Sequence, residues 1–236
     1  MLKSKLMQLL KSNAEKGCPI RAEKKGDEAT LYLYDAIGDW YGVSAKDFCK
    51  ALAGIDAKTI HLRINSPGGD VFEARTIATA LKQCGKSVVA HIDGVCASAA
   101  TYVALAASSV EMAQGSFFMI HQAWAGVIGN SGELRDLAAL LDKVDDSIIA
   151  DYVAKSGKDA DSIKEMMAAE TWMTAQEAMD FGFIDSVFDG KPADCTKWDL
   201  SAYEHAPAAL KNQDDDSAQH RERFEKRLFI VEDTGR

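Results

Sequence analysis

The sequence lacks a long hydrophobic run. No apolar stretch approaches the about 18 residues that cross a bilayer, so we expect no membrane segment. The N-terminus starts with basic and apolar residues, as secretory leaders do, but Lys5 and Gln8 interrupt it and no small-residue cleavage site follows. We therefore expect no signal peptide and a cytoplasmic location.

Excess positive charge and paired cysteines are also lacking. The net charge of −9 at pH 7 excludes a general nucleic-acid binder, because phosphate binding needs clustered Lys and Arg. No two cysteines form a CxxC pair, which favours free thiols in a reducing compartment over disulfides or a zinc site. We expect no metal and no cofactor. The cysteines are Cys18, Cys49, Cys84, Cys96 and Cys195.

The order of the predicted elements indicates an α/β core. Apolar strand patterns alternate with helical patterns, which is typical of parallel strands covered by helices. We predict strands at 29–37, 59–64, 87–94, 109–113, 117–123 and 183–189, and helices at 44–54, 71–84, 98–107, 131–155, 162–170 and 174–182. The helix at 131–155 is long and amphipathic, and we expect it to project from the core and pack on a partner.

Composition divides the chain into three parts. Residues 1–28 are polar and basic and predict a short amphipathic helix or a mobile arm. Residues 29–190 form the predicted folded domain. Residues 191–236 are polar and dense in charge, and they predict a flexible tail or one that is ordered by a partner.

Ser98 lies where a predicted strand passes into an alanine-rich helix. The free N–H groups at a helix start can stabilise an oxyanion, and small neighbours leave room for an acyl group. Serine is also a common helix cap, and this segment alone favours that simpler interpretation. Cys96 could be the nucleophile instead, but Ser98 holds the position facing the amides, so we interpret Cys96 as a buried packing residue.

The ends of two other predicted strands also carry candidate catalytic groups, each of which is weak evidence alone. His121 follows four apolar residues, where a histidine is more often structural than catalytic. The turn at 65–70, with sequence NSPGGD, exposes backbone amides but lacks the spacing of a phosphate-binding loop. The carboxyl ends of parallel strands meet in one crevice. Together with Ser98, these features therefore predict one acyl-transfer site.

The chain resembles the ClpP-type serine peptidases from about Ala29 to Asp189. The motifs that carry this resemblance occur in family order: INSPGGDVFEA, DGVCASAATYVA, FFMIHQ and ETWMTAQEAMDFGFID. The amino-acid sequences of these motifs are most similar to those of the ClpP-related head maturation proteases of tailed phages and prophages. The resemblance implies a ClpP/crotonase-like spiral of βαβ units, in which the helix at 131–155 is a projecting handle.

The resemblance assigns roles to individual residues. Ser98 matches the nucleophile and His121 the general base. The backbone amides of the oxyanion hole match Gly69, Asp70 and Ala99. Glu170 stands where the family has the aspartate of the triad; a glutamate can also orient an imidazole, although its extra methylene changes the geometry. Thr171, or no third member at all, remains an alternative.

The resemblance also implies a function. We expect a serine endopeptidase that cleaves capsid or scaffold proteins during phage head assembly, in a homo-oligomeric ring or stacked rings with internal active sites. Its location would be the cytoplasm of a bacterium or an infected host, and the sequence does not say whether an ATPase partner exists. The alternatives are the proteolytic subunit of a general ATP-dependent Clp protease, a crotonase-fold acyl-CoA enzyme, and a catalytically silent ring or scaffold protein.

Overall fold

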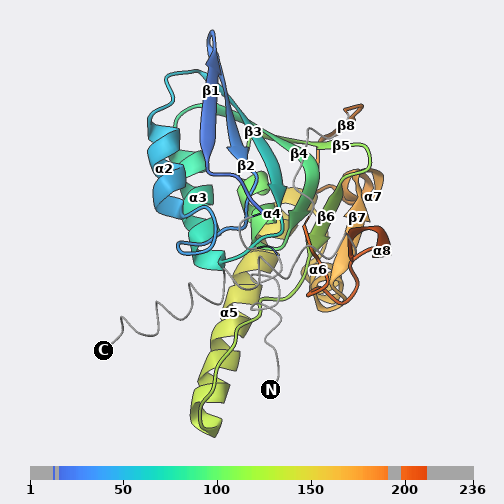
Figure 1. Cartoon of the computed structure of the whole chain (residues 1–236). Coiled ribbons are helices and arrows are strands. Elements are labelled where there is room, and N and C mark those ends of the chain that lie inside the picture. The colour runs from blue at the N-terminus through green and yellow to red at the C-terminus, as the bar shows by residue number, and fades with distance from the viewer. Residues whose placement is uncertain (1–12, 14–15, 191–197, 212–236) are drawn as a thin grey trace, which may run out of the picture.

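The computed structural model describes residues 13, 16–190 and 198–211 (Figure 1). Their strands form one sheet in the order β1-β2-β3-β4-β5-β8, with β6 beside β4 and β7 beside β6. The strands are β1 (Arg21–Lys25), β2 (Glu28–Leu33), β3 (Thr59–Ser66), β4 (Ser87–Ala97), β5 (Ser109–Ala113), β6 (Phe117–Ile120), β7 (Thr171–Thr174) and β8 (Ser186–Phe188). Strands β2 to β5 and β8 are parallel neighbours, which confirms the predicted α/β core.

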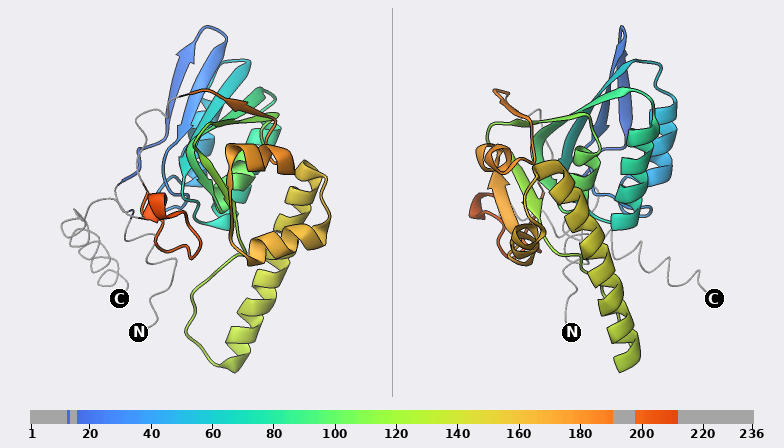
Figure 2. Two further views of the ribbon diagram at one scale, coloured as in Figure 1. Left: turned by 90° about the vertical axis from the view of Figure 1, so that its right-hand side faces the viewer. Right: turned by 180° about the vertical axis from the view of Figure 1, so that it is seen from behind.

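The helices cover the sheet from different sides (Figures 1 and 2). They are α2 (Ala45–Ala53), α3 (Val71–Gln83), α4 (Ala99–Leu105), α5 (Ser131–Ser156), α6 (Ala160–Ala168), α7 (Ala175–Phe181) and α8 (Ala208–Lys211). Side-chain caps set several of the helix starts. The Ser44 hydroxyl accepts from the amide of Asp47 at α2, and the Asp70 carboxylate accepts from the amides of Phe72 and Glu73 at α3.

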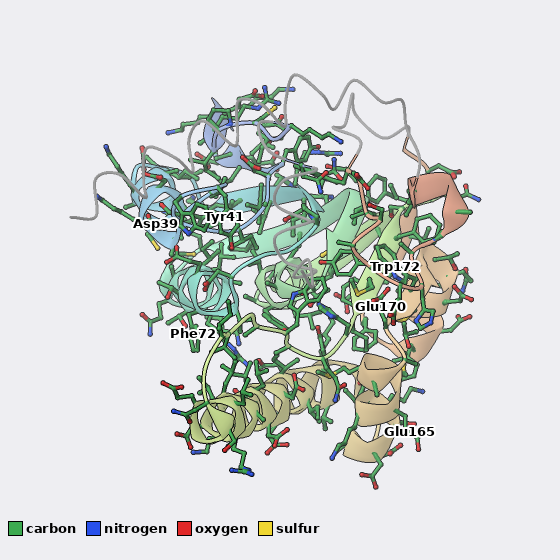
Figure 3. All side chains as sticks on the ribbon, turned by 60° about the horizontal axis from the view of Figure 1, so that its bottom comes forward. Asp39, Tyr41, Phe72, Glu165, Glu170 and Trp172 are labelled. Carbon is green, nitrogen blue, oxygen red and sulfur yellow. The ribbon has the colours of Figure 1, made fainter. Side chains whose placement is uncertain are left out.

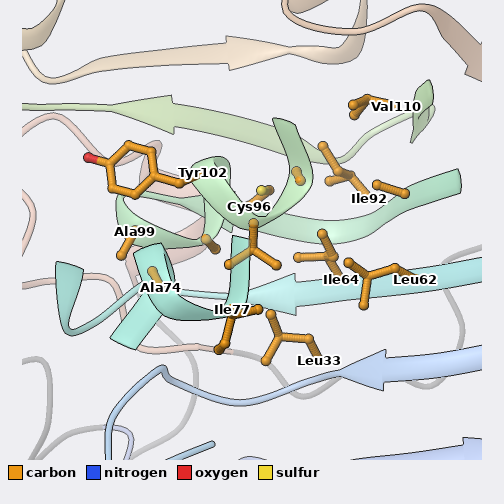
Figure 4. Close-up of a cluster of buried hydrophobic side chains, with 14 of the residues drawn as sticks. Leu33, Leu62, Ile64, Ala74, Ile77, Ile92, Cys96, Ala99, Tyr102 and Val110 are labelled. Carbon is orange, nitrogen blue, oxygen red and sulfur yellow. The ribbon is translucent and has the colours of Figure 1, made fainter. Parts of the chain in front are cut away.

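The main core lies between the parallel strands and helices α3 and α4 (Figure 4). Leu62 and Ile64 on β3 and Ile92 on β4 are fully buried, and Ile77 of α3 packs in the same cluster. Each large apolar side chain contributes about 1.5–3 kcal/mol when it is fully buried. This packing fixes the ends of β3 and β4, from which the turn at 65–70 and Ser98 emerge.

Strand β4 divides the sheet. Its first part pairs with β5 from Val89 to Ile92, and its last part pairs with β6 from Val95 to Ala97. The register between β3 and β4 shifts at this point, where the Asn65 side chain accepts a hydrogen bond of 3.0 Å from the amide of Val95. The end of β4 therefore lies beside the end of β6, so the residues that follow these two strands meet.

Helix α5 projects from the body of the molecule, as predicted (Figure 2). Asn130 and Glu133 form a reciprocal capping box at its start, and Gly157 ends it in the left-handed conformation. Only its C-terminal half is anchored, through Ile148, Ile149 and Tyr152. Its N-terminal half leaves large apolar side chains exposed, among them Leu134 at 48% and Leu140 at 47%. None of the described helices is long and apolar enough to cross a membrane.

Residues 21–25 and 198–211, within the two terminal parts, are more structured than the sequence predicted. Residues 21–25, assigned to the mobile arm, form β1 as the antiparallel neighbour of β2. In the part assigned to the flexible tail, residues 198–211 pack on the body, because Trp198, Leu200 and Tyr203 bury their side chains in a second, smaller core shared with β4 and β6. The predictions for residues 1–12, 14–15, 191–197 and 212–236 lie outside the described residues.

Candidate active site

Ser98 has a strained backbone. It lies between β4 and α4 with φ 53° and ψ −125°, in the positive-φ range that residues other than glycine seldom adopt. Small residues make the sharp turn feasible, because a side chain at Gly68 would meet the Ala97 carbonyl at 2.6 Å and the Ser98 Cβ at 2.8 Å. Such a turn holds the serine side chain out from the backbone, as in other hydrolases with a nucleophile between a strand and a helix.

The structure brings Ser98 and His121 together. The amide of Ser98 donates to the Met119 carbonyl of β6 at 2.9 Å, and the chain reaches His121 two residues later. The His121 Nε2 and Ser98 Oγ atoms are 2.7 Å apart. This is the distance at which an imidazole can take the proton of a serine hydroxyl.

The predicted oxyanion donors differ in availability. The amide of Asp70 donates to the Ile37 carbonyl at 2.8 Å, so the prediction that it faces the site is wrong for this structure. No hydrogen bond between described residues uses the amides of Gly69 or Ala99. Only glycine fits at 69, because φ is 149° and a Cβ would lie 2.1 Å from the Ile37 carbonyl oxygen. Gly69 and Ala99 therefore remain as candidate donors.

Glu170 is buried near the pair but is engaged elsewhere. Its carboxylate accepts hydrogen bonds from the amides of Glu204 at 3.0 Å and His205 at 2.7 Å, and from the Trp172 indole at 3.3 Å. Figure 3 shows Glu170 and Trp172 side by side. Its backbone has φ 49°. A direct contact with His121 thus stays a prediction. The alternative, Thr171, donates its hydroxyl to the Met166 carbonyl at 2.7 Å.

Aromatic side chains surround His121, and sequence reasoning missed them. The rings of Trp124 and Tyr203 each meet the imidazole edge to face, at centroid distances of 5.1 and 5.4 Å. They also stack on one another at 5.4 Å, and Trp172 meets Tyr203 edge to face. The sequence signal was WDLSAY, an apolar pattern within a polar tail.

Cys96 is fully buried in the main core. Burial raises the pKa of its thiol above the usual range, which keeps the thiol protonated and unreactive. Ser98, in contrast, has its hydroxyl against an imidazole. This environment fits the interpretation of Cys96 as a packing residue.

Comparisons with known proteins agree with this geometry. The Clp protease family pattern matches residues 28–191, more than half of the chain. The ATP-dependent Clp protease proteolytic subunit 1 of Protochlamydia amoebophila is 32% identical over 171 residues, covering 69% of this chain and 82% of the relative. The proteolytic subunit of Ligilactobacillus salivarius is 32% identical over 136 residues, covering 57% and 69%.

A solved structure supports the fold. A mutant of ClpP1 from Listeria monocytogenes superposes with a TM-score of 0.60, covers 69% of this chain and 92% of its own, and is 24% identical. At this identity the likeness shows the fold alone, and it agrees with the expected spiral architecture. The expectation of a phage head maturation protease is not matched by the names of these relatives. From the family match and the fold, the chain belongs to the Clp protease family and is a peptidase of the serine class.

Proposed function

We propose that this protein is a serine endopeptidase in which Ser98 is the nucleophile and His121 the general base. The observation that carries the proposal is the 2.7 Å contact between His121 Nε2 and the hydroxyl of a serine with a strained backbone. A serine that only caps a helix needs neither the contact with His121 nor the strained backbone. The Ser98 side chain also makes no capping hydrogen bond to α4, which argues against the cap interpretation.

The proposed reaction has two steps. In the first, Ser98 Oγ attacks the carbonyl carbon of a peptide bond while His121 Nε2 takes its proton. The amides of Gly69 and Ala99 donate to the oxyanion, and the leaving amine receives the proton from His121 as the C–N bond breaks. In the second step, water attacks the ester under general-base catalysis by His121 and releases the acid and the free Ser98 hydroxyl.

Glu170 belongs to the proposed site as a supporting residue. Its buried carboxylate makes hydrogen bonds to Trp172 and to the backbone of Glu204 and His205, next to the rings that contact His121. We propose that its influence on the imidazole passes through these neighbours.

The proposed substrates are polypeptides that enter a homo-oligomeric ring. The exposed leucines of α5 support assembly, because an isolated chain leaves them in water. The relatives' names favour the proteolytic subunit of an ATP-dependent Clp protease. Cleavage of capsid or scaffold proteins is the second candidate function. It is supported by the amino-acid sequence of the motifs around NSPGGD, which resembles that of the phage head maturation proteases.

A fluorophosphonate probe tests the proposed chemistry. We expect one label per chain, located on Ser98 by mass spectrometry, and loss of labelling in His121→Ala. Ser98→Ala controls for reaction elsewhere. Absence of label on folded, assembled wild-type protein would contradict the proposal and favour an acyl-CoA enzyme or a silent ring. Label on Cys96 with iodoacetamide, together with loss of activity, would make the thiol the nucleophile.

A further inference from the structure

The C-terminal segment, residues 198–211, covers the candidate active site without adding a described strand to the sheet. It is held by a small core in which Trp198, Leu200 and Tyr203 pack against side chains of β4 and β6. Hydrogen bonds add to this attachment: the Trp198 indole donates to Asn65 at 3.2 Å, and Asn13 exchanges two hydrogen bonds with the backbone of Asp199.

Tyr203 is the residue of this segment that reaches the site. It is 1% exposed, and its ring lies against His121 on one side and is stacked on Trp124. Its hydroxyl donates to the Pro67 carbonyl at 2.7 Å. Pro67 lies in the turn that carries Gly69. One side chain thus contacts both the proposed base and the turn that supplies a proposed oxyanion donor.

The phenol also lies beside the nucleophile. Burial raises the pKa of Tyr203, and the neighbouring Ser98 hydroxyl opposes that increase. The net direction is upward, so the phenol stays protonated and remains a hydrogen-bond donor to the Pro67 carbonyl.

Glu170 anchors the segment next to Tyr203. Its carboxylate accepts from the amides of the two residues that follow Tyr203, and this pairing seats the tyrosine between His121 and Trp172. Charge-assisted hydrogen bonds to a buried carboxylate are strong, because the carboxylate has little water to bind instead.

We propose that Tyr203 is a positioning residue of the peptidase. Its ring keeps the His121 imidazole aligned with Ser98, its hydroxyl fixes the oxyanion turn, and Glu170 acts by anchoring the segment. This inference rests on the proposed function.

An alternative is that the segment is an inhibitor that leaves before substrate binds. The burial pattern argues against it. Departure would expose the whole small core, including Trp198, Leu200 and Tyr203, and would leave the carboxylate of Glu170 without the two amides that satisfy it.

The test compares Tyr203→Leu, Tyr203→Phe and the packing control Leu200→Ala. Leu200 is equally buried in the small core but belongs to none of the ring contacts around His121. The readouts are the rate constant and the final stoichiometry of fluorophosphonate labelling, and kcat and KM for a fluorogenic peptide. A purely structural defect lowers the stoichiometry, whereas misalignment lowers the rate constant of every site.

We expect Tyr203→Leu to lower the labelling rate constant and kcat by about 100-fold, with full stoichiometry and unchanged KM. Tyr203→Phe keeps the ring and loses one hydrogen bond, so it should stay within about 10-fold of wild type. Leu200→Ala should label at the wild-type rate. If Tyr203→Leu does not fold, Trp124→Leu removes the ring on which Tyr203 stacks, and we expect the same direction of change.

Three results would overturn the inference. They are an unchanged rate in Tyr203→Leu, an equal loss in Leu200→Ala, and faster labelling in the Tyr203 variants, which would identify the segment as an inhibitor. If wild-type protein does not react with the probe, that result would instead contradict the proposed function. Failure of the Tyr203 inference can therefore be distinguished from failure of the proposed function.

Discussion

At the scale of single residues, the site depends on Gly68, because the absence of a side chain there leaves room for Ser98. Gly68 has φ 90°, and a methyl group there would lie 2.8 Å from the Ser98 Cβ and 2.6 Å from the Ala97 carbonyl oxygen. Because Ser98 is already strained, it cannot yield without losing its alignment with His121.

Gly68→Ala is therefore predicted to lower the rate of Ser98 labelling by about 100-fold. The matched control is Gly26→Ala, which has a similar backbone, φ 64°, but meets nothing within 4 Å. The control should lose about 1 kcal/mol of stability and keep its labelling rate. Equal labelling by the two variants would show that space beside Ser98 does not matter.

Sequence reasoning located residues whose role follows from local pattern. Ser98 and His121 follow apolar strands, and the convergence of parallel strand ends predicted that they meet. Asp70 was assigned wrongly as a donor because its amide pairs with Ile37, a partner 33 residues away by number, which no local pattern reveals. Tyr203 was missed because a short apolar pattern within a polar tail is a weak sequence signal.

At the scale of elements, Asn65 joins three parts of the chain. From the end of β3 it accepts from the amide of Val95, where β4 changes partners, and from the indole of Trp198 in the C-terminal segment. Asn65 is 1% exposed. Both donors are buried, so neither has water as a substitute.

Asn65→Ala should lower the free energy of unfolding by about 1–3 kcal/mol and Tm by about 2–4 °C for each kcal/mol. Gln83→Ala, at the exposed end of α3, is the control and should leave Tm unchanged. Thermal unfolding followed by circular dichroism measures both. If both variants keep the wild-type Tm, the two hydrogen bonds accepted by Asn65 do not contribute to stability.

Most elements could be predicted from periodicity and capping signals. Helices α2, α3 and α5 have clear caps and helical spacing, and their bounds match the prediction within a few residues. Strand β7 was missed because TWMT is short, and it becomes a strand only by pairing antiparallel with β6. Such pairing depends on tertiary structure rather than on local propensity.

At the scale of the whole molecule, α5 is the proposed surface for assembly. It projects beyond the core with Leu134 and Leu140 exposed, and only its C-terminal half packs on the body (Figure 2). An apolar surface on a projecting helix favours association with further copies of the chain.

Leu140→Glu should shift the assembly toward smaller species, because the interface would then bury a charge. Ala139→Glu adds the same charge at the neighbouring exposed position, about 100° around the helix from Leu140, and should leave the assembly intact. Native mass spectrometry gives the distribution of species. Identical distributions for wild type and Leu140→Glu would exclude this part of α5 from the interface.

The central claim is that Ser98, activated by His121, hydrolyses peptide bonds. Its most direct test is the hydrolysis of a fluorogenic peptide by wild-type protein and by Ser98→Ala, with equal assembly and Tm verified first. The account predicts turnover by the wild type and loss of that turnover in Ser98→Ala. Equal rates in the two proteins would contradict it.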